Sequence, residues 1–501
     1  MTFDELTEAV LTISPQLLDS REAATIVESC GVTDRIAASD FGFPDTFAVG
    51  EHILRHSRAR ATVAARKEMP KASFLREAGI AAHKFSLSFA YALPWTLLLV
   101  VEYWRPNLLQ LSPEWGGVLS LSVIASLIGA GGFGQMISRI GYFYIGMKEP
   151  TLALRLCLLF AKWGALACCL LGSMGFLLAY HFRLFTPRYL AWGSVNFLML
   201  SMLWMFCAML SVLGRRWNIL LIFILGGAVF AVLQAESRLG TVPSIFIANA
   251  SALGIGAASA VLGFRFWPGT SSPRTSSAAL PRLPLVLLML MPYFLYGVAY
   301  FSFLFADRVA AGSAIPWASG LSFGIDSQYK KGMDVGLFIF LVLAAVVEYM
   351  VDHFMRYWFR LAEEEHDTER IRYRLTRRYR LLLIVLCLLF ALLASGLWLA
   401  YSRLEPAVRV TAVLGSVGYF FVALGLFNLI VLSSVNQPER AVGLVGVALV
   451  ANFLTGYVLS HLIGVQFAAI GLLVGGFVLF VVSSRTIRVV LQQSAFFYAL
   501  A

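Results

Sequence analysis

The chain has 501 residues, of which 59% are hydrophobic and only 13% charged, and its mean hydropathy is +0.78. Soluble globular domains average about 45–50% apolar and about 25% charged residues, so this composition excludes an ordinary soluble protein. The formal net charge is +11. Because no soluble segment is large enough to carry a basic stripe, the positive charge does not indicate binding to nucleic acid.

The first 75 residues differ from the rest, because residues 1–13 and 17–40 are acidic and amphipathic. Apolar residues at helical spacing predict a first helix, and they are Phe3, Leu6, Val10 and Ile13. No basic segment precedes an apolar stretch here, so a signal peptide is not indicated. We expect residues 1–75 to form a small cytoplasmic helical domain. Such a domain would either dock a partner or cap the cytoplasmic loops.

Twelve later stretches are long and apolar enough to span a membrane, which takes about 20 residues of helix. They cover residues 84–104, 115–136, 152–181, 189–213, 217–234, 243–264, 283–307, 334–354, 380–401, 408–432, 440–460 and 463–483. A polar break divides them into two sets of six. The sequence therefore predicts an all-α polytopic membrane protein, with an N-lobe at 84–266, a cytoplasmic linker at 267–282, a C-lobe at 283–485 and a cytoplasmic tail at 486–501.

The placement of Lys and Arg predicts the orientation of the chain. With the N-terminus inside, 29 of the 39 basic residues fall in cytoplasmic segments and nine in outer loops. The last one, Lys162, lies within the third span. Cytoplasmic loops carry an excess of basic residues, so we expect both termini to be cytoplasmic. The membrane is then the inner, cytoplasmic membrane of the cell.

Two spans, the first and the seventh, carry aromatic and polar residues along one helix face. The first has Lys84, Ser88, Tyr91, Trp95 and Glu102, and the seventh has Tyr293, Tyr296, Tyr300, Phe303 and Asp307. At 100° per residue each set occupies a stripe of about 60–80°. Interior prolines, Pro94 and Pro292, permit both helices to bend. The stripes favour two equivalent helices facing a central cavity, where rings stack on sugars; aromatic packing without a ligand is the alternative.

Charged residues inside spans are the next signal, because a charge at the bilayer centre costs about 2.5–3.5 kcal/mol on insertion scales. Lys162 lies about ten residues into the third span, and we interpret it as a cavity residue or as one partner of a structural ion pair. Glu348 and Asp352 lie on one face of the eighth span. They are candidates for binding a coupling ion, with structural pairing to Arg356 and its neighbours as the favoured alternative.

Motifs of enzymes and of cofactor binding are lacking in the sequence. There is no Walker A sequence, no nucleophile elbow, no His-Glu-x-x-His pair and no dinucleotide fingerprint. The six cysteines form no Cys-x-x-Cys pair, so they indicate neither a zinc site nor a disulfide framework. We therefore expect neither an enzyme nor a cofactor or metal.

With these features the chain resembles the multidrug, oligosaccharidyl-lipid and polysaccharide (MOP) flippase superfamily. Within it, the second half resembles the PelG family of exopolysaccharide exporters. The resemblance rests on Tyr296-Gly297-Val298-Ala299-Tyr300, Leu304-Phe305-Ala306-Asp307-Arg308, Tyr329-Lys330-Lys331-Gly332-Met333, the residue Glu348 and the Arg-rich loop that follows. The acidic-basic pair that marks the end of the family's seventh helix corresponds to Asp307 and Arg308. The domain at 1–75 departs from the usual exporter of this family.

The resemblance implies a biofilm polysaccharide exporter that works by alternating access of two six-helix lobes. Its substrate cavity would include Asp307, Arg308 and the aromatic stripes. The polymer would come from a cytoplasmic glycosyltransferase, with other membrane subunits of an export complex as further partners. Three alternatives stay open: a lipid-linked oligosaccharide or multidrug flippase of the same fold, a membrane glycan polymerase or acyltransferase, and a scaffold without transport.

Overall fold

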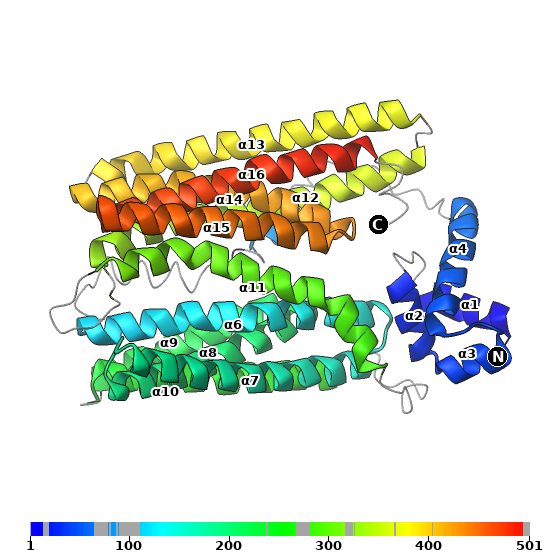
Figure 1. Ribbon diagram of the computed structural model, residues 1–501, viewed down its shortest axis with the longest axis horizontal. Helices are drawn as coiled ribbons and strands as arrows, with labels where there is room; N and C mark the ends of the chain where they lie inside the picture. Colours follow the sequence, from blue (N-terminus) through cyan, green and yellow to red (C-terminus); the bar gives the residue numbers. More distant parts are fainter. Residues whose placement is uncertain are drawn as a thin grey trace.

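The computed structural model describes residues 2–13, 20–64, 79, 82–86, 89, 111–236, 239–266, 281–315, 324, 326–364, 367–402 and 404–493. Within these ranges all regular secondary structure is helical, which confirms the predicted fold class. Figure 1 shows two groups of long helices lying one above the other, with a cluster of short helices at one end. We call α6–α10 the first helix group, α12–α16 the second helix group and α1–α4 the N-terminal unit.

Eleven helical segments among the described residues are long and apolar enough to cross a membrane. The first helix group consists of α6 (Pro113–Gly146), α7 (Pro150–His181), α8 (Pro187–Val212), α9 (Arg216–Glu236) and α10 (Thr241–Arg265), and α11 (Leu283–Ser313) follows it. The second helix group consists of α12 (Ser327–Glu364), α13 (Thr368–Ser402), α14 (Pro406–Ser434), α15 (Pro438–Leu462) and α16 (Ala469–Gln492), the last preceded by the 3-10 turn η2 (Val465–Ala468). These segments confirm the eleven later predicted spans. The predicted first span, 84–104, lies largely outside the described residues.

Proline lies at the first or second position of six of these helices, namely α6, α7, α8, α11, α14 and α15. It suits the first turn because its φ is already helical and its missing N–H has no partner there. The turns before α7, α8 and α15 each contain a residue with positive φ: Lys148, Arg183 and Asn436. Short turns of this kind make consecutive helices antiparallel neighbours, as Figure 1 shows.

Buried polar side chains link the helices within each group. In the first group, Asn196 of α8 donates through Nδ2 to Ser122 Oγ of α6 at 2.7 Å, and its Oδ1 accepts from Asn249 of α10 at 3.0 Å. In the second group, Tyr379 of α13 donates to Asn428 of α14 at 2.9 Å. Because a buried polar group without a partner is costly, these bonds favour one register of each helix pair.

Helix α11 connects the cores of the two groups. Val286 and Leu290, in its first half, lie in the hydrophobic core of the first helix group. Phe303 and Leu304, in its second half, lie in the core of the second helix group. Pro292 lies between these halves, and the helix changes direction along its length in Figure 1. An interior proline removes a backbone hydrogen bond and permits such a bend.

The N-terminal unit comprises α1 (Phe3–Ile13), α2 (Ser20–Ser29), α3 (Asp34–Asp40) and α4 (Thr46–Ala64). It has a hydrophobic core of its own, in which Leu6 is fully buried. Phe143 and Met147, at the end of α6, pack against that core. The Ser29 and Tyr144 hydroxyls lie 3.4 Å apart across the same boundary. The unit is therefore docked on the end of the first helix group.

Ion pairs extend this docking to α11 and to the second helix group. Arg282, directly before α11, donates its backbone N–H to Glu28 at 3.0 Å and pairs through its guanidinium with Asp34. Arg21 lies 3.5 Å from Glu439 at the start of α15. The N-terminal unit thus contacts both helix groups, and Arg21–Glu439 is a polar contact that reaches the second one.

Docking of the N-terminal unit is expected to weaken at acidic pH. The pKa of Asp34 lies below its ordinary value because its carboxylate accepts from the Thr46 backbone N–H and pairs with Arg282. A lowered folded-state pKa stabilises the N-terminal unit itself through Thr46, and its docking through Arg282, above the ordinary value of 3.8. This stabilisation is lost as the pH falls through the lowered pKa. The Asp34 side chain is 40% exposed, so water screens the pair and the change is modest.

Hydrogen exchange of α2–α4 at pH 7, 5 and 3 measures this effect. We expect equal protection at pH 7 and 5 and a loss of protection at pH 3. In Asp34→Asn the loss between pH 5 and pH 3 should be smaller. An identical pH profile in this variant would contradict the assignment to Asp34.

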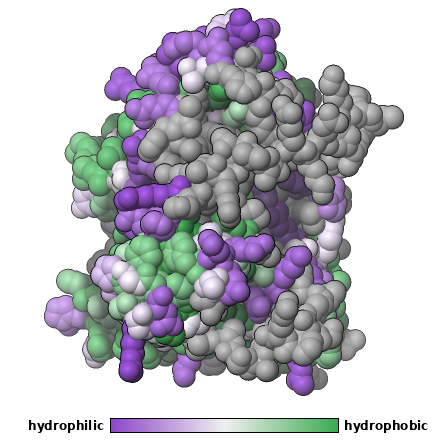
Figure 2. All heavy atoms as spheres, turned by 90° about the vertical axis from the view of Figure 1, so that its right-hand side faces the viewer, coloured by the Kyte–Doolittle hydropathy of each residue, from purple (hydrophilic) through white to green (hydrophobic). Residues whose placement is uncertain are grey.

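Helices α12 and α13 are longer than a membrane requires. At 1.5 Å per residue, their 38 and 35 residues correspond to about 50–57 Å, whereas the hydrocarbon core is about 30 Å thick. Their joined ends lie at the upper right of Figure 1, at the same end of the molecule as the N-terminal unit. Figure 2 shows hydrophilic side chains gathered at the top of this end. Both helices therefore extend beyond the apolar layer here.

Candidate functional site

Three glycines bring α6 and α11 into close contact. A Cβ on Gly297 of α11 would lie 2.4 Å from the carbonyl oxygen of Gly131 in α6. A Cβ on Gly132 would lie 2.5 Å from the Phe294 ring. Small residues permit such close approach of helix backbones in membranes. The face of α11 that carries Gly297 is therefore held against α6, whereas Tyr296 and Tyr300 of the aromatic stripe pack against the core of the second helix group.

The predicted stripe on α11 extends from a partly accessible region into a fully buried one. Tyr296 and Tyr300 stack with their ring centroids 5.7 Å apart, and both are half-buried. Phe303 and Asp307, further along the same face, are fully buried. Tyr293 lies at the other end, where it lines a cavity described below. The 14 residues from Tyr293 to Asp307 span about 21 Å of helix.

A buried charge cluster lies at the Asp307 end of the stripe. Tyr329 of α12 donates its hydroxyl to Asp307 Oδ2 at 2.6 Å. Arg308 donates to Asp334 Oδ1 at 2.9 Å, and Lys330 lies 3.1 Å from Asp334 Oδ2. The Arg308 and Asp334 side chains are only 12% and 2% exposed. Because charges in such an environment need close counter-charges, α11 and α12 are tightly coupled here.

Two buried side-chain oxygens, one on α11 and one on α15 facing it, make no hydrogen bond of ordinary geometry within the described part of the chain. Asp307 Oδ1 and Asn452 Oδ1 are buried without a hydrogen-bond partner among the described residues, although Asn452 Nδ2 donates to the Phe303 carbonyl at 2.8 Å. Buried acceptors are normally satisfied, so a donor is expected at Asp307. A proton on the carboxyl group, a water molecule or a cation would each serve. Within the described residues no three His, Cys, Asp or Glu side chains converge as a metal site would require.

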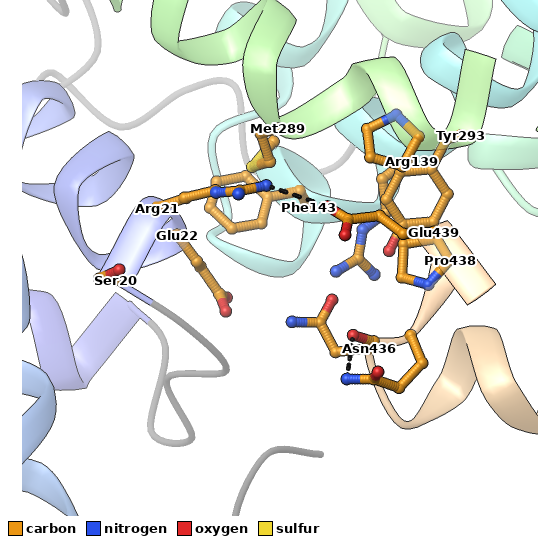
Figure 3. Close-up of a pocket in the computed structure, with 12 residues that line it drawn as sticks. Ser20, Arg21, Glu22, Arg139, Phe143, Met289, Tyr293, Asn436, Pro438 and Glu439 are labelled. Atoms are coloured by element: carbon orange, nitrogen blue, oxygen red, sulfur yellow. Dashed lines mark hydrogen bonds and ion pairs between the residues drawn. The ribbon is translucent and has the colours of Figure 1, made fainter. Parts of the chain in front are cut away.

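A cavity of about 290 Å³ lies where the N-terminal unit meets both helix groups (Figure 3). Its lining residues include Arg21, Glu22, Arg139, Tyr293, Asn436 and Glu439. The Arg139 guanidinium lies over the Tyr293 ring, 5.2 Å from its centroid. Charged groups of both signs, amides and an aromatic ring suit a polar ligand with hydroxyl groups better than an apolar one. We call this space the junction cavity.

Glu348 and Asp352, the two carboxylates predicted as candidates for ion coupling, both form ion pairs with basic side chains. Glu348 of α12 lies 2.7 Å from Arg216 at the start of α9, so this pair joins the two helix groups. Asp352 lies 2.7 Å from Lys84 and 3.1 Å from Arg356. Pairing with Arg356 is the alternative that the sequence favoured. Glu348, however, pairs with the opposite helix group rather than with the arginines that follow it.

Lys162 does not lie with the α11 residues. Its side chain is exposed on α7, on the same face as Leu158 and Leu166, which are 37% and 61% exposed. This exposed apolar face of a membrane helix is suited to lipid. A lysine can remain there because its long aliphatic stem lets the ammonium group reach the polar boundary. The remaining predicted cavity residues, Ser88, Tyr91 and Trp95, lie outside the described residues.

Sequence reasoning did not select Arg139, Asp334 or Gly131 as site residues. Arg139 was counted among the basic residues that follow the second predicted span, but it lies in α6 and lines the junction cavity. Asp334 lies four residues after Lys330, so the two side chains share one helix face. This spacing was the feature of the sequence from which their pairing could have been predicted. For Gly131 the available signal is the cluster of glycines at 129, 131, 132 and 134, which favours close helix approach but does not identify the partner helix.

Comparisons with known proteins identify the fold but no family. No protein-family description matches the chain, and no curated protein matches it in sequence. Solved structures do match. A MATE transporter of Vibrio cholerae has a TM-score of 0.55 at 13% identity, covering 84% of this chain and 99% of its own. An outward-facing multidrug resistance MATE transporter of the MOP superfamily has a TM-score of 0.53 at 14% identity, with 82% and 96% coverage.

This protein has the MOP transporter fold. A third solved structure agrees, a MOP superfamily transporter from Pyrococcus furiosus with a TM-score of 0.55, 14% identity and coverage of 82% and 96%. Its binding pocket is described as having reversed polarity that suggests a different function. The fold is therefore found with binding pockets of differing polarity. It does not identify the substrate, which has to be inferred from the site residues of this chain.

Proposed function

We propose that this protein is an inner-membrane exporter that moves a polysaccharide outward by alternating access between its two helix groups. The N-terminal unit and the ends of α12 and α13 would face the cytoplasm, where most basic residues would then lie. The polymer would come from a cytoplasmic glycosyltransferase within an export complex, and the resemblance of the α11 region to PelG exporters supports this substrate class.

The observation that carries the proposal is the path along α11. One face of a single bent helix leads from the polar junction cavity, past the stacked rings of Tyr296 and Tyr300, to the buried carboxyl of Asp307. Aromatic faces followed by polar groups suit a sugar chain, because C–H faces of sugars pack on rings while hydroxyls need hydrogen-bond partners. Since α11 contributes to both cores, a relative movement of the helix groups would reshape this path.

Alternating access requires that contacts between the helix groups break and re-form. Two ion pairs at the N-terminal unit's end would have to open in such a cycle, Arg216–Glu348 and Arg21–Glu439. Asp307 is the carboxylate with an unsatisfied oxygen on the α11 path, so we assign a coupling proton or cation to it. Glu348 and Asp352, with their basic partners, would instead stabilise one end state.

Export in cells that lack the native gene tests the proposal. Complementation with wild type should restore secreted polysaccharide, whereas Tyr300→Ala and Asp307→Asn should each lower secretion at least tenfold and leave polymer inside the cell. Tyr180→Ala is the matched control, because Tyr180 is 56% exposed on α7 and should leave secretion unchanged. Membrane levels of each variant are measured in parallel.

Normal secretion by both α11 variants would contradict the assigned path. Unchanged secretion in the strain without the gene would contradict the polysaccharide substrate itself. The second candidate is then a lipid-linked oligosaccharide or multidrug flippase, which the similarity to multidrug MATE structures favours. Drug accumulation in the same strains distinguishes it, because loss of a drug exporter raises the intracellular drug concentration.

A further inference from the structure

Helix α13 presents one exposed apolar face along its membrane-length part. The exposed residues Leu381, Ile384, Leu388 and Leu392 recur at helical spacing, and they are 47%, 54%, 64% and 67% exposed. The opposite face is buried against the second helix group through Leu375, Tyr379, Leu382 and Leu386. In a membrane protein, an exposed face of large aliphatic side chains contacts lipid chains.

Exposed arginines lie on the same face of α13, in the turns that precede Leu381. Arg370, Arg374 and Arg377 are all exposed, and at 100° per residue they lie within about 40° of Leu381. Arg377 precedes Leu381 by about 6 Å along the axis and Arg374 by about 10 Å. A strip that touches lipid chains therefore passes directly into a strip of guanidinium groups.

Exposed aromatic residues place the membrane boundary at these arginines. Tyr373 is 67% exposed and Trp398 is 68% exposed near the other end of α13. Tyr and Trp are enriched at both membrane–water interfaces. The 25 residues between them correspond to about 37 Å, which is close to the thickness of about 40–45 Å for a bilayer with its headgroups. Arg374 and Arg377 therefore lie at the depth of lipid headgroups.

Among the described residues, this strip carries more arginines than carboxylates. Arg370 lies 3.3 Å from Asp367, which offsets one positive charge. Glu369 is 3.1 Å from Arg372, which lies on the other side of the helix. Arg377 has no ion-pair partner among the described residues, and Arg378 is directed inward, toward His353 and Tyr357 of α12. Glu369, Arg370, Tyr373 and Arg374 line an open hollow of about 340 Å³ on this strip.

We propose that this strip of α13 is a binding site for the headgroup of an anionic phospholipid in the adjacent leaflet. The guanidinium groups of Arg374 and Arg377 bind the phosphate through paired N–H donors, which match phosphate geometry. The acyl chains lie along Leu381, Ile384 and Leu388. This site is separate from the α11 path and does not depend on which substrate the protein transports.

Lipid titration followed by native mass spectrometry tests this site. The purified protein is titrated with phosphatidylglycerol and, separately, with phosphatidylcholine. Each basic residue near an anionic membrane surface contributes on the order of a fivefold gain in binding. The double variant Arg374→Gln/Arg377→Gln should therefore bind phosphatidylglycerol about thirtyfold more weakly, with binding of phosphatidylcholine unchanged.

Arg372→Gln is the matched control, because it removes the same exposed charge from the opposite side of the same helix. It should bind phosphatidylglycerol like wild type. Equal weakening in the control, or no weakening in the double variant, would overturn the proposal. Displacement of the lipid by inorganic phosphate at equal concentration would also overturn it, because the site would then bind free anions. Equal thermal unfolding temperatures in phosphatidylcholine nanodiscs would show that the double variant is folded.

Discussion

Gly297→Leu is expected to abolish accumulation of folded protein in the membrane. Even a Cβ at this position would lie 2.4 Å from the Gly131 carbonyl oxygen and 2.9 Å from the Gln135 side chain. The first of these neighbours is backbone, so it cannot rotate away, and α6 and α11 must separate. Overpacking a core costs about 1–3 kcal/mol even when side chains adjust, and here the whole helix pair must move. Monodispersity in detergent and thermal unfolding measure the result.

Gly443→Leu is the matched control for this substitution. Gly443 lies in α15, and a Cβ there would meet no atom within 4 Å. Leucine also favours a helix over glycine by up to about 1 kcal/mol, so this variant should be at least as stable as wild type. If Gly297→Leu remained as monodisperse and stable as Gly443→Leu, the close crossing of α6 and α11 would be refuted.

Hydropathy predicted the eleven described spans because each apolar stretch is longer than a core helix of a soluble protein needs. It did not predict how far the helices continue. The eighth span was expected at 334–354, whereas α12 covers Ser327–Glu364. Beyond the apolar layer the helix continues with polar residues such as Arg356 and Arg360, so the apolar run ends before the helix does. Hydropathy reports the thickness of the membrane, not the length of the helix.

Periodicity predicted contacts within one helix but not contacts between helices. The α11 stripe predicted from a spacing of three and four residues is present, including the stacked Tyr296 and Tyr300. The pairing of Arg308 with Asp334 depends on how α11 and α12 are rotated against each other, which periodicity does not define. For Lys162, a lone charge in an apolar span indicated either a cavity or a structural ion pair. The aliphatic residues at positions 158 and 166, on the same face, indicate lipid instead.

Arg308→Met is expected to destabilise the protein by about 3–5 kcal/mol, which is the usual cost of removing one partner of a buried ion pair. Asp334, only 2% exposed, would lose its 2.9 Å contact with the guanidinium. Lys330→Met is the matched control, because it removes a cation from the same carboxylate but from a position that is 32% exposed. It should cost less than Arg308→Met, because Lys330 is the more exposed of the two cations and Arg308 still pairs with Asp334. Thermal unfolding in lipid nanodiscs compares the two variants.

A double variant separates the loss of the ion pair from the loss of packing. Arg308→Met/Asp334→Leu removes both members of the buried pair and leaves the Lys330 side chain, which is 32% exposed, without its contact to Asp334. Replacing a buried pair by apolar residues of similar volume is often neutral or stabilising. We therefore expect it to be more stable than Arg308→Met alone. Recovery would show that the instability of the single variant comes from the Asp334 carboxylate, for which Lys330 alone is not a sufficient counter-charge. Equal instability of the single and double variants would indicate that Arg308 acts mainly through other contacts, such as its position over the Phe305 ring at 5.4 Å.

In either case Asp307 keeps its 2.6 Å hydrogen bond from Tyr329. Transport by a stable double variant would therefore show whether the path on α11 works without the neighbouring charges.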